Sequence, residues 1–156
     1  MNKIPMTATG YEKLQNELKH LVNKERPEII AAIAEARTHG DLSENAEYQY
    51  AKEQQSLNEG KIAELETTIA NAEIIDVSKL SGKEIKFGAT VKIKDEQSGE
   101  QSTYQIVGEY EFDIENKKIS INSPLARSLI GKTKDEIVEV NSPKGISTYK
   151  VISIKY

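Results

Sequence analysis

The chain has 156 residues, of which 29% are charged and 6% aromatic, with no cysteine and no tryptophan. A chain of this length forms one ordinary domain or two small ones, and neither of two small domains can hold a large pocket-bearing core. The lack of cysteine excludes disulfides, thiolate metal sites and thiol catalysis. The first residues lack the apolar run of a signal peptide and no segment approaches transmembrane length, so we expect a cytoplasmic protein without a membrane partner.

The net charge is −4, and the charged residues are distributed unevenly between the two halves of the chain. Residues 1–75 carry 8 basic and 13 acidic side chains, whereas residues 76–156 carry 13 basic and 12 acidic ones. Neither half has the strong positive charge with which an autonomous DNA-binding protein neutralises phosphates. An acidic first half is typical of a solvated helical surface, so charge alone points to no partner.

The first stretch of regular structure is predicted to be an amphipathic helix from about Tyr11. Apolar residues recur every three or four positions, as in one face of a helix: Tyr11, Leu14, Leu18, Leu21, Ile29, Ala32, Ile33 and Ala36. Thr7 or Thr9 is a candidate N-cap, and Glu12 would complete a capping box with Thr9. Pro27 lacks a backbone donor and clashes with the preceding turn, which predicts a kink or a one-turn break over residues 24–27.

A second stripe of the same period predicts a second helix. Its members are Tyr48, Ala51, Gln55, Asn58, Ile62, Leu65, Ile69 and Ala72, with polar residues in the middle. Each stripe is too narrow to form a core alone, but the two can cover each other. Residues 39–43 between them contain Gly, Asp and Ser, which favour a reversal. The first half, residues 1–76, is therefore predicted to be an antiparallel helical hairpin with an acidic tip at residues 39–45.

After Asp76 the period changes from helical to alternating. Segments rich in β-branched residues predict half-buried strands at 89–94, 102–107, 118–121, 136–140 and 148–154. Ser123 and Pro124 are typical of an N-cap and first position of a short helix that ends at Gly131. We therefore expect residues 77–156 to form a small antiparallel α+β domain, with a joint at residues 77–82.

The sequence predicts no P-loop, zinc site or catalytic triad. Gly131-Lys132-Thr133 resembles the end of a P-loop, but Ala126 stands where that motif needs glycine. His20 and His39 lie on different parts of the hairpin, so neither a zinc site nor a catalytic triad is predicted. We interpret each histidine as a solvated surface residue.

The segment around Asp41 and Glu44 is open to two interpretations. In the simpler one, Asp41 or Ser43 is an N-cap, and Glu44 and Glu47 lie near the positive end of the helix dipole. However, Leu42 would be exposed at the end of a rod, where it has no core to join. Asp41 and Glu44 are three residues apart, so they can point the same way if the turn tightens into helix.

Two carboxylates can contribute to a magnesium site. Mg²⁺ commonly takes one or two carboxylates, with waters and substrate phosphate oxygens as its other ligands. The tip supplies no further ligand and no surrounding pocket. If Asp41 and Glu44 act in chemistry, they must therefore do so inside another molecule.

Several segments resemble the Gre transcript cleavage factors of bacteria, and the resemblance covers essentially the whole chain. The matching stretches are residues 9–14, 26–29 and 123–132 and, most specifically, the tip segment 36–48, which reads ARTHGDLSENAEY. Few basic residues lie along the hairpin, which favours the less basic branch of the family.

The resemblance implies an N-terminal coiled-coil hairpin and a C-terminal FKBP-like domain. It also implies a partner, bacterial RNA polymerase, whose secondary channel the hairpin enters while the globular domain holds the channel rim. The polymerase would remain the nuclease, cleaving the nascent RNA in backtracked complexes, so the chain is not expected to be an autonomous enzyme. Asp41 and Glu44 would hold a Mg²⁺ shared with the polymerase active site, and the free protein, expected to be a monomer, would hold none.

Further positions follow from the resemblance. Arg37 and Lys52 match positions that face the extruded RNA, although solvated helix charges would look the same. Ser123 and Pro124 match the polymerase-binding region, although a cap without a partner would look the same. Tyr48 is expected either to steady the tip or to pack against Arg37. The residues expected to support the tip are Leu42, Ser43, Asn45 and Tyr48.

Two alternatives remain. A Gre-like regulator could occupy the same channel and inhibit without promoting cleavage, but such relatives differ chiefly in their tip acids. A prolyl isomerase or peptide-binding chaperone is suggested by the FKBP-like fold alone, which is weak support for a function. It would need an aromatic-lined cavity, which is hard to build from Tyr104, Tyr110, Phe112, Tyr149 and Tyr156 because the chain has few aromatic residues.

Overall fold

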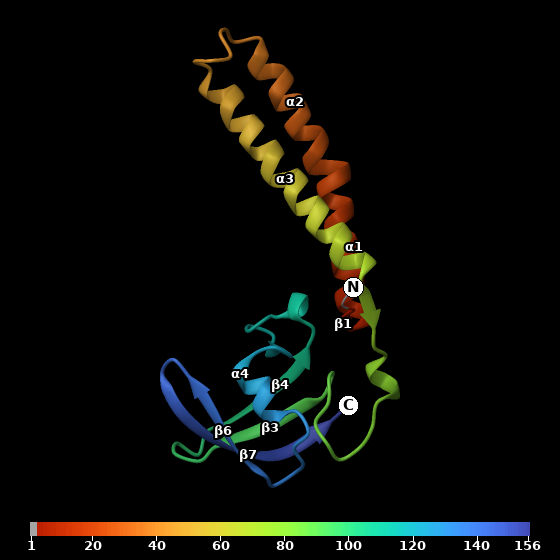
Figure 1. Ribbon diagram of the computed structural model, residues 1–156, viewed down its shortest axis with the longest axis vertical. Coiled ribbons are helices and arrows are strands. Elements are labelled where there is room, and N and C mark those ends of the chain that lie inside the picture. Colours follow the sequence, from red (N-terminus) through yellow and green to blue (C-terminus); the bar gives the residue numbers. More distant parts are fainter. Residues whose placement is uncertain (1–2) are drawn as a thin grey trace. The chain divides into compact units, whose positions relative to one another are not determined.

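The structure, a computed structural model, describes residues 3–156. It divides into two compact units, each shown in Figure 1. The helical unit comprises Tyr11–Ala72, and the globular unit comprises residues 3–10 together with Glu73–Tyr156. The sequence had suggested a division after residue 76. In the structure, the globular unit also includes a short segment from the start of the chain.

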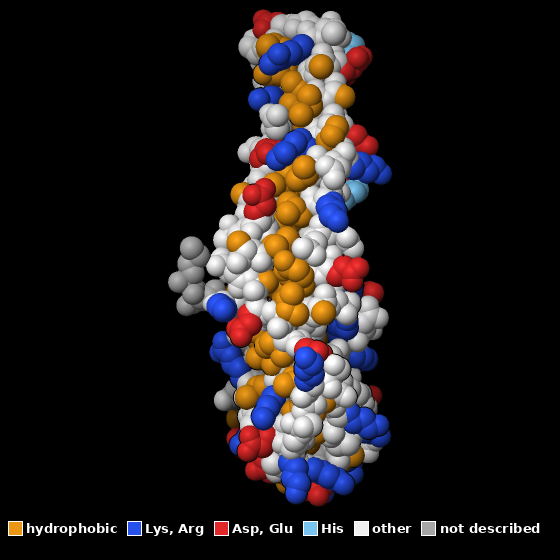
Figure 2. Space-filling view, turned by 90° about the vertical axis from the view of Figure 1, so that its right-hand side faces the viewer, with side chains coloured by type: hydrophobic (Ala, Val, Ile, Leu, Met, Phe, Trp, Pro, Cys, Tyr) orange, Lys and Arg blue, Asp and Glu red, His pale blue; other side chains and the backbone are white. Residues whose placement is uncertain are grey.

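The helical unit is an antiparallel hairpin. Its first arm consists of α1 (Ala8–His20), a π-helical turn η1 (Leu21–Glu25) and α2 (Arg26–Arg37), and its second arm is α3 (Ala46–Ala70). α2 and α3 run side by side (Figure 1). The predicted apolar stripes supply the buried side chains Leu14, Leu21, Ile33, Ala36, Ala51, Ile62 and Leu65. Ala32, predicted to be in the stripe, is exposed. Figure 2 shows hydrophobic side chains in a line along this unit, flanked by charged ones.

The predicted break near Pro27 is a π-helical turn. The Arg26 N–H donates to the carbonyl of Leu21, five residues back, and Pro27 occupies the first turn of α2. Widening the helix by one residue removes the need for a donor at Pro27 and moves its ring away from the preceding carbonyls. The buried Asn58 of α3 donates through Nδ2 to the same Leu21 carbonyl at 3.2 Å. The polar residue in the middle of the second stripe therefore binds the irregular turn of the first arm.

The globular unit contains two sheets. β1 (Ile4–Met6) and β2 (Ala72–Ile74) form a two-stranded sheet that was not predicted, because three-residue strands leave no alternating pattern. The five-stranded sheet has the order β5-β4-β3-β7-β6. Its strands are β3 (Thr90–Asp95), β4 (Gln101–Val107), β5 (Lys118–Ser120), β6 (Ile137–Ser142) and β7 (Gly145–Lys155). All neighbours are antiparallel except β4 and β5, which are parallel.

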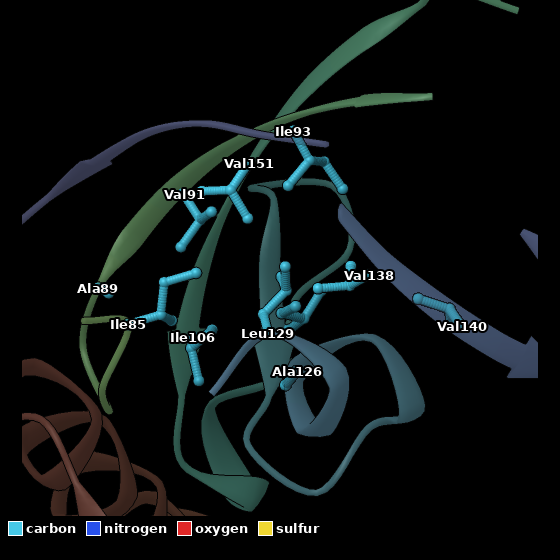
Figure 3. Close-up of a cluster of buried hydrophobic side chains, with 11 residues drawn as sticks. Ile85, Ala89, Val91, Ile93, Ile106, Ala126, Leu129, Val138, Val140 and Val151 are labelled. Atoms are coloured by element: carbon cyan, nitrogen blue, oxygen red, sulfur yellow. The ribbon is translucent and has the colours of Figure 1, made fainter. Parts of the chain in front are cut away.

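Helix α4 (Pro124–Leu129) covers one face of the larger sheet, and two 3₁₀ turns, η2 (Val77–Lys79) and η3 (Glu109–Glu111), connect strands. Figure 3 shows the core between the helix and the sheet, where Ala126 and Leu129 of α4 meet apolar side chains of the strands: Val91, Ile93, Ile106, Val138 and Val151. The expected class, a helical hairpin followed by a small α+β domain, is confirmed. Within residues 3–156, no helix has the length and apolarity to cross a membrane.

Candidate functional site at the hairpin tip

Residues 38–45 connect the two arms of the hairpin. α2 ends with the amides of Thr38 and His39 bonded to the carbonyls of Glu35 and Ala36, at 3.0 and 3.1 Å. Gly40 follows with a φ of +122°, a conformation that side chains rarely adopt, and nothing lies within 4 Å of where its Cβ would be. The glycine therefore lets the chain reverse and leave the helix abruptly.

The Asp41 side chain accepts hydrogen bonds from Ser43, two residues later, and so forms a short turn. Its Oδ1 accepts hydrogen bonds from the Ser43 amide at 3.0 Å and the Ser43 hydroxyl at 2.9 Å, and its carbonyl accepts from the Glu44 amide at 3.3 Å. These bonds, first from the Ser43 amide and then from its hydroxyl, lower the pKa of Asp41 below its ordinary value, because they favour the charged form. The Ser43 hydrogen bonds therefore orient the Asp41 carboxylate and favour its charged form.

Asn45, rather than Asp41 or Ser43, is the N-cap of α3. Its Oδ1 accepts from the Tyr48 amide at 3.1 Å, and its Nδ2 donates to the Ala36 carbonyl, the last turn of α2, at 2.6 Å. The simpler interpretation of Asp41 or Ser43 as a cap is therefore wrong. One side-chain amide satisfies backbone groups of both helix ends. A carboxylate could cap the helix but could not donate to the carbonyl.

Asp41 and Glu44 line the same open hollow, of about 440 Å³, at the end of the hairpin. Within residues 3–156, neither Asp41 Oδ2 nor the Glu44 carboxylate accepts a hydrogen bond, so these oxygens are available to a ligand. Two carboxylates of this kind fit Mg²⁺ as part of its ligand set. The described residues contain no group of three potential ligands that could hold a metal by itself. We call this pair of exposed carboxylates, Asp41 and Glu44, the half-site.

His39 lies on the wall of the same hollow. Its Nε2 is 3.3 Å from Glu35 on α2 and 4.0 Å from Glu47 on α3. The interpretation of this histidine as a merely solvated residue is therefore incomplete. It is half-exposed, but it lies between carboxylates of the two arms.

Arg37 and Lys52 both line a groove of about 260 Å³ on the side of the hairpin, with Gln55 and apolar side chains of α2. The Arg37 guanidinium lies 5.9 Å from the centroid of the Tyr48 ring, so of the two expectations for Tyr48 the structure shows packing against Arg37. Lys52 donates to Gln55 at 3.1 Å. The two cations therefore share a surface beside the tip.

Ser123 and Pro124 lie in the globular unit, at the start of α4. The Ser123 hydroxyl accepts from the Ala126 amide at 3.2 Å, and the exposed Pro124 follows as the first helical residue. The capping role is present whether or not a partner binds. Leu42 and Ser43 are exposed in the tip, and Ser43 is the residue that orients Asp41.

One supporting contact of the tip was not predicted. Gln49 donates through Nε2 to the Ser43 carbonyl at 3.1 Å, which ties the turn to the first helical turn of α3. A glutamine on an exposed helix position carries no sequence signal for such a bond. Only its position, four residues after the cap Asn45, is consistent with a bond back to the turn.

Comparison with known proteins gives matches along the chain. The family description "Transcription elongation factor, N-terminal" matches residues 4–74, and "Transcription elongation factor, GreA/GreB, C-term" matches residues 80–156. Proteins named transcription elongation factor GreA from Chelativorans sp. strain BNC1 and Caulobacter vibrioides are 60% and 56% identical over 156 residues. Each alignment covers 100% of this chain and 99% of the relative.

Among solved structures, GreA factor homolog 1 (Gfh1) of Thermus thermophilus matches with 26% identity and a TM-score of 0.45, over 99% of this chain and 100% of that one. The transcription elongation factor GreA/GreB from Nitrosomonas europaea matches with 21% identity and a TM-score of 0.43, also over 99% of this chain and 100% of that one. The sequence matches cover both halves of the chain at high identity. The chain therefore belongs to the GreA/GreB family of transcription elongation factors.

Proposed function

We propose that the chain binds bacterial RNA polymerase, inserts its hairpin tip through the secondary channel, and promotes cleavage of the nascent RNA 3′ end in backtracked complexes. The observation that carries this proposal is the half-site at the tip. Asp41 and Glu44 line one hollow and lie on an exposed turn, and within residues 3–156 neither Asp41 Oδ2 nor the Glu44 carboxylate accepts a hydrogen bond. Two exposed carboxylates at the end of a hairpin can complete a metal site whose remaining ligands belong to another molecule.

The chemistry assigned to the tip is provision of charge and of ligands. When bound, a Mg²⁺ shared with the polymerase would activate water and stabilise the charge that develops on the phosphodiester oxygens. Asp41 contributes a carboxylate that Ser43 orients through hydrogen bonds, which also favour its charged form. Glu44 contributes the second carboxylate. The polymerase is the nuclease in this proposal, and the chain is not an enzyme by itself.

The remaining site residues are assigned to binding. Arg37 and Lys52, which share a groove beside the tip, would face phosphates of the extruded RNA. Ser123 and the exposed Pro124 at the start of α4 would contact the rim of the channel. A partner of this kind places the chain in the cytoplasm.

Within residues 3–156, two hollows of the globular unit do not favour prolyl isomerase or chaperone activity. Both are lined by polar and aliphatic residues, and neither has an aromatic side chain in its wall. The hydroxyl of Tyr156 is occupied, since it donates to the Glu84 carbonyl at 2.5 Å and accepts from the Lys86 amide at 3.0 Å. Tyr110 and Phe112 are exposed on and beside η3. Neither hollow is therefore the aromatic-lined cavity that such an activity would need.

The test uses stalled, backtracked polymerase complexes with Mg²⁺ and measures release of short 3′ RNA fragments. We expect Asp41→Asn and Glu44→Gln each to lower stimulated cleavage by at least about 100-fold, the order found when a single group that stabilises transition-state charge is removed. Binding to polymerase should remain close to that of the unaltered chain. Glu53→Gln, at an exposed carboxylate on α3, is the matched control and should change neither quantity.

Each alternative has its own outcome in this experiment. Undiminished cleavage by either tip variant would refute the ligand role, and an equal loss of binding would make the tip structural. If the unaltered chain binds polymerase but only slows elongation, the inhibitor interpretation is correct instead.

A further inference from the structure

The first helix of the hairpin begins inside the globular unit, and its N-terminus is capped in an unusual way. Thr7 is the N-cap of α1, because its hydroxyl accepts from the Gly10 amide at 3.1 Å. Thr9 and Glu12, the other predicted pair, make no such contact within the described residues. In a capping box, the third helical residue is a Glu or Gln whose side chain accepts from the N-cap amide. Here that position is Gly10, which has no side chain.

Glu111 supplies the missing carboxylate from 104 positions away in the sequence. Its two oxygens each lie 3.1 Å from the Thr7 amide nitrogen, and Oε1 also accepts from the Thr7 hydroxyl. Its Oε2 accepts from the Gly108 amide at 2.8 Å. α1 has no acidic residue in its own first turn. Glu111 therefore provides both the reciprocal hydrogen bond of a capping box and the negative charge that favours a helix N-terminus.

Two glycines make room for this carboxylate. A Cβ on Gly10 would lie 2.0 Å from Glu111 Oε1 and 2.4 Å from its Cγ. A Cβ on Gly108 would lie 2.3 Å from the Pro5 carbonyl oxygen and 2.8 Å from Glu111 Oε2. All four distances are shorter than a real Cβ makes, so a side chain at either position would force a neighbouring atom to move. Glycine in the first turn of a helix is therefore explained by close approach of Glu111, since alanine would otherwise favour the helix.

The neighbouring backbone is fixed at the same place. Met6 is fully buried, and its carbonyl accepts from the Ile75 amide at 2.8 Å. Together these contacts hold residues 5–10 on the segment 108–111 and on Ile75 by hydrogen bonds, charge and close packing.

We propose that Glu111 is a positioning residue that completes a split capping box at the start of α1, and that the action of the hairpin tip depends on it. The second part rests on the function proposed above. Without Glu111, the first turn of α1 frays from the globular unit. The tip then retains its own geometry, but α1, the helix that begins the first arm, loses its ordered first turn.

Amide hydrogen exchange on the full chain tests the cap independently of any polymerase. Glu111→Ala should speed exchange of the Thr7 and Gly10 amides by about tenfold, the loss expected for a charged hydrogen bond. Glu111→Gln, which keeps an acceptor oxygen but loses the charge, should have a smaller effect. Glu115→Ala, at a neighbouring exposed carboxylate, is the control and should leave both amides unchanged.

A double-mutant cycle tests whether Glu111 is the reason for glycine at position 10, because the effect of Gly10→Ala on amide exchange should change sign when Glu111 is removed. Gly10→Ala should speed exchange in the first turn of α1 when Glu111 is present, and should slow it when Glu111 is alanine, because the obstructing carboxylate is then absent. Gly60→Ala, where nothing lies within 4 Å of the added Cβ, is the matched control. It should slow exchange in α3 by at most about fivefold in either background.

The functional part is tested with backtracked polymerase complexes over a range of factor concentrations. Glu111→Ala should lower the maximal cleavage rate while leaving the half-saturating concentration unchanged, and Glu111→Gln should restore part of the rate. Unchanged exchange at Thr7 and Gly10 would overturn the split capping box. Lost protection with unaltered maximal cleavage would overturn the positioning role. Failure of the unaltered chain to stimulate cleavage would refute the proposed function and, with it, the positioning role, while the exchange result would still stand.

Discussion

At the scale of single residues, the tip depends on side chains that bind backbone. Asp41 is oriented by Ser43, and Asn45 joins the end of α2 to the start of α3. The sequence suggested Asp41 or Ser43 as the cap because all three residue types are good caps. The distinguishing contact is the Asn45 donor to Ala36, nine residues back, and it depends on the path of the loop that Gly40 sets.

Asn45→Ala should destabilise the tip by about 1–2 kcal/mol, since it removes an N-cap acceptor and a donor to a helix C-terminus. Asn45→Asp keeps the cap oxygen and loses only the donor, so it should cost an intermediate amount. Amide exchange at Tyr48 and in the last turn of α2 measures both effects. Wild-type protection of α2 in Asn45→Asp would show that the bond to Ala36 contributes nothing.

At the scale of elements, the two arms are joined where the first one is irregular. Asn58 binds the carbonyl of Leu21 in the π-helical turn, and Arg26 makes two hydrogen bonds to Glu59, at 2.9 and 2.7 Å. Apolar periodicity was sufficient to predict both helices, and Pro27 to predict an interruption. The π geometry could not be predicted, because it is matched to an asparagine on the other arm.

The Arg26–Glu59 pair gives a pH-dependent prediction. The side-chain hydrogen bond from Arg26 lowers the pKa of Glu59 below its ordinary 4.5. The contribution of the pair to hairpin stability is therefore fully present above that ordinary value and is lost as the pH falls through the lowered one. Arg26→Lys removes the bidentate hydrogen bonding to Glu59 and should move the pKa of Glu59 back toward 4.5.

Carbon-13 NMR titration of the Glu59 carboxyl measures this shift. Lys24→Ala, which removes a cation two residues before Arg26 that makes no bond to Glu59 within the described residues, is the control and should leave the titration of Glu59 unaltered. An identical Glu59 titration in Arg26→Lys and the unaltered chain would contradict the assigned cause.

At the scale of the whole molecule, sequence order and spatial grouping differ at the start of the chain. The N-terminal family description covers residues 4–74, yet residues 3–10 pack with the globular unit. The strand patterns predicted the five-stranded sheet, whose core alternates along β3 and β6. They could not predict β1, because a three-residue strand leaves no alternating pattern. They also could not predict that Thr7 rather than Thr9 is the cap, because the residue that decides it, Glu111, is distant in sequence.

Met6→Ala should therefore destabilise the globular unit, although Met6 precedes the hairpin in the sequence. Truncating a fully buried methionine costs about 2–5 kcal/mol. Amide exchange should accelerate around Val107 and Gly108, whereas α2 and α3 should retain their protection. Equal losses of protection in the hairpin would contradict this grouping.

The central claim is that Asp41 and Glu44 act as one unit and only inside the polymerase. The most direct measurement is the cleavage rate of backtracked complexes at saturating factor for Asp41→Asn, Glu44→Gln and the double variant. If the two carboxylates share one metal, each single variant should lose nearly all stimulation, and the double variant should lose little more. The claim would be contradicted if the fold-loss of the cleavage rate in the double variant equalled the product of the two single losses. Substantial cleavage by either single variant would also contradict it.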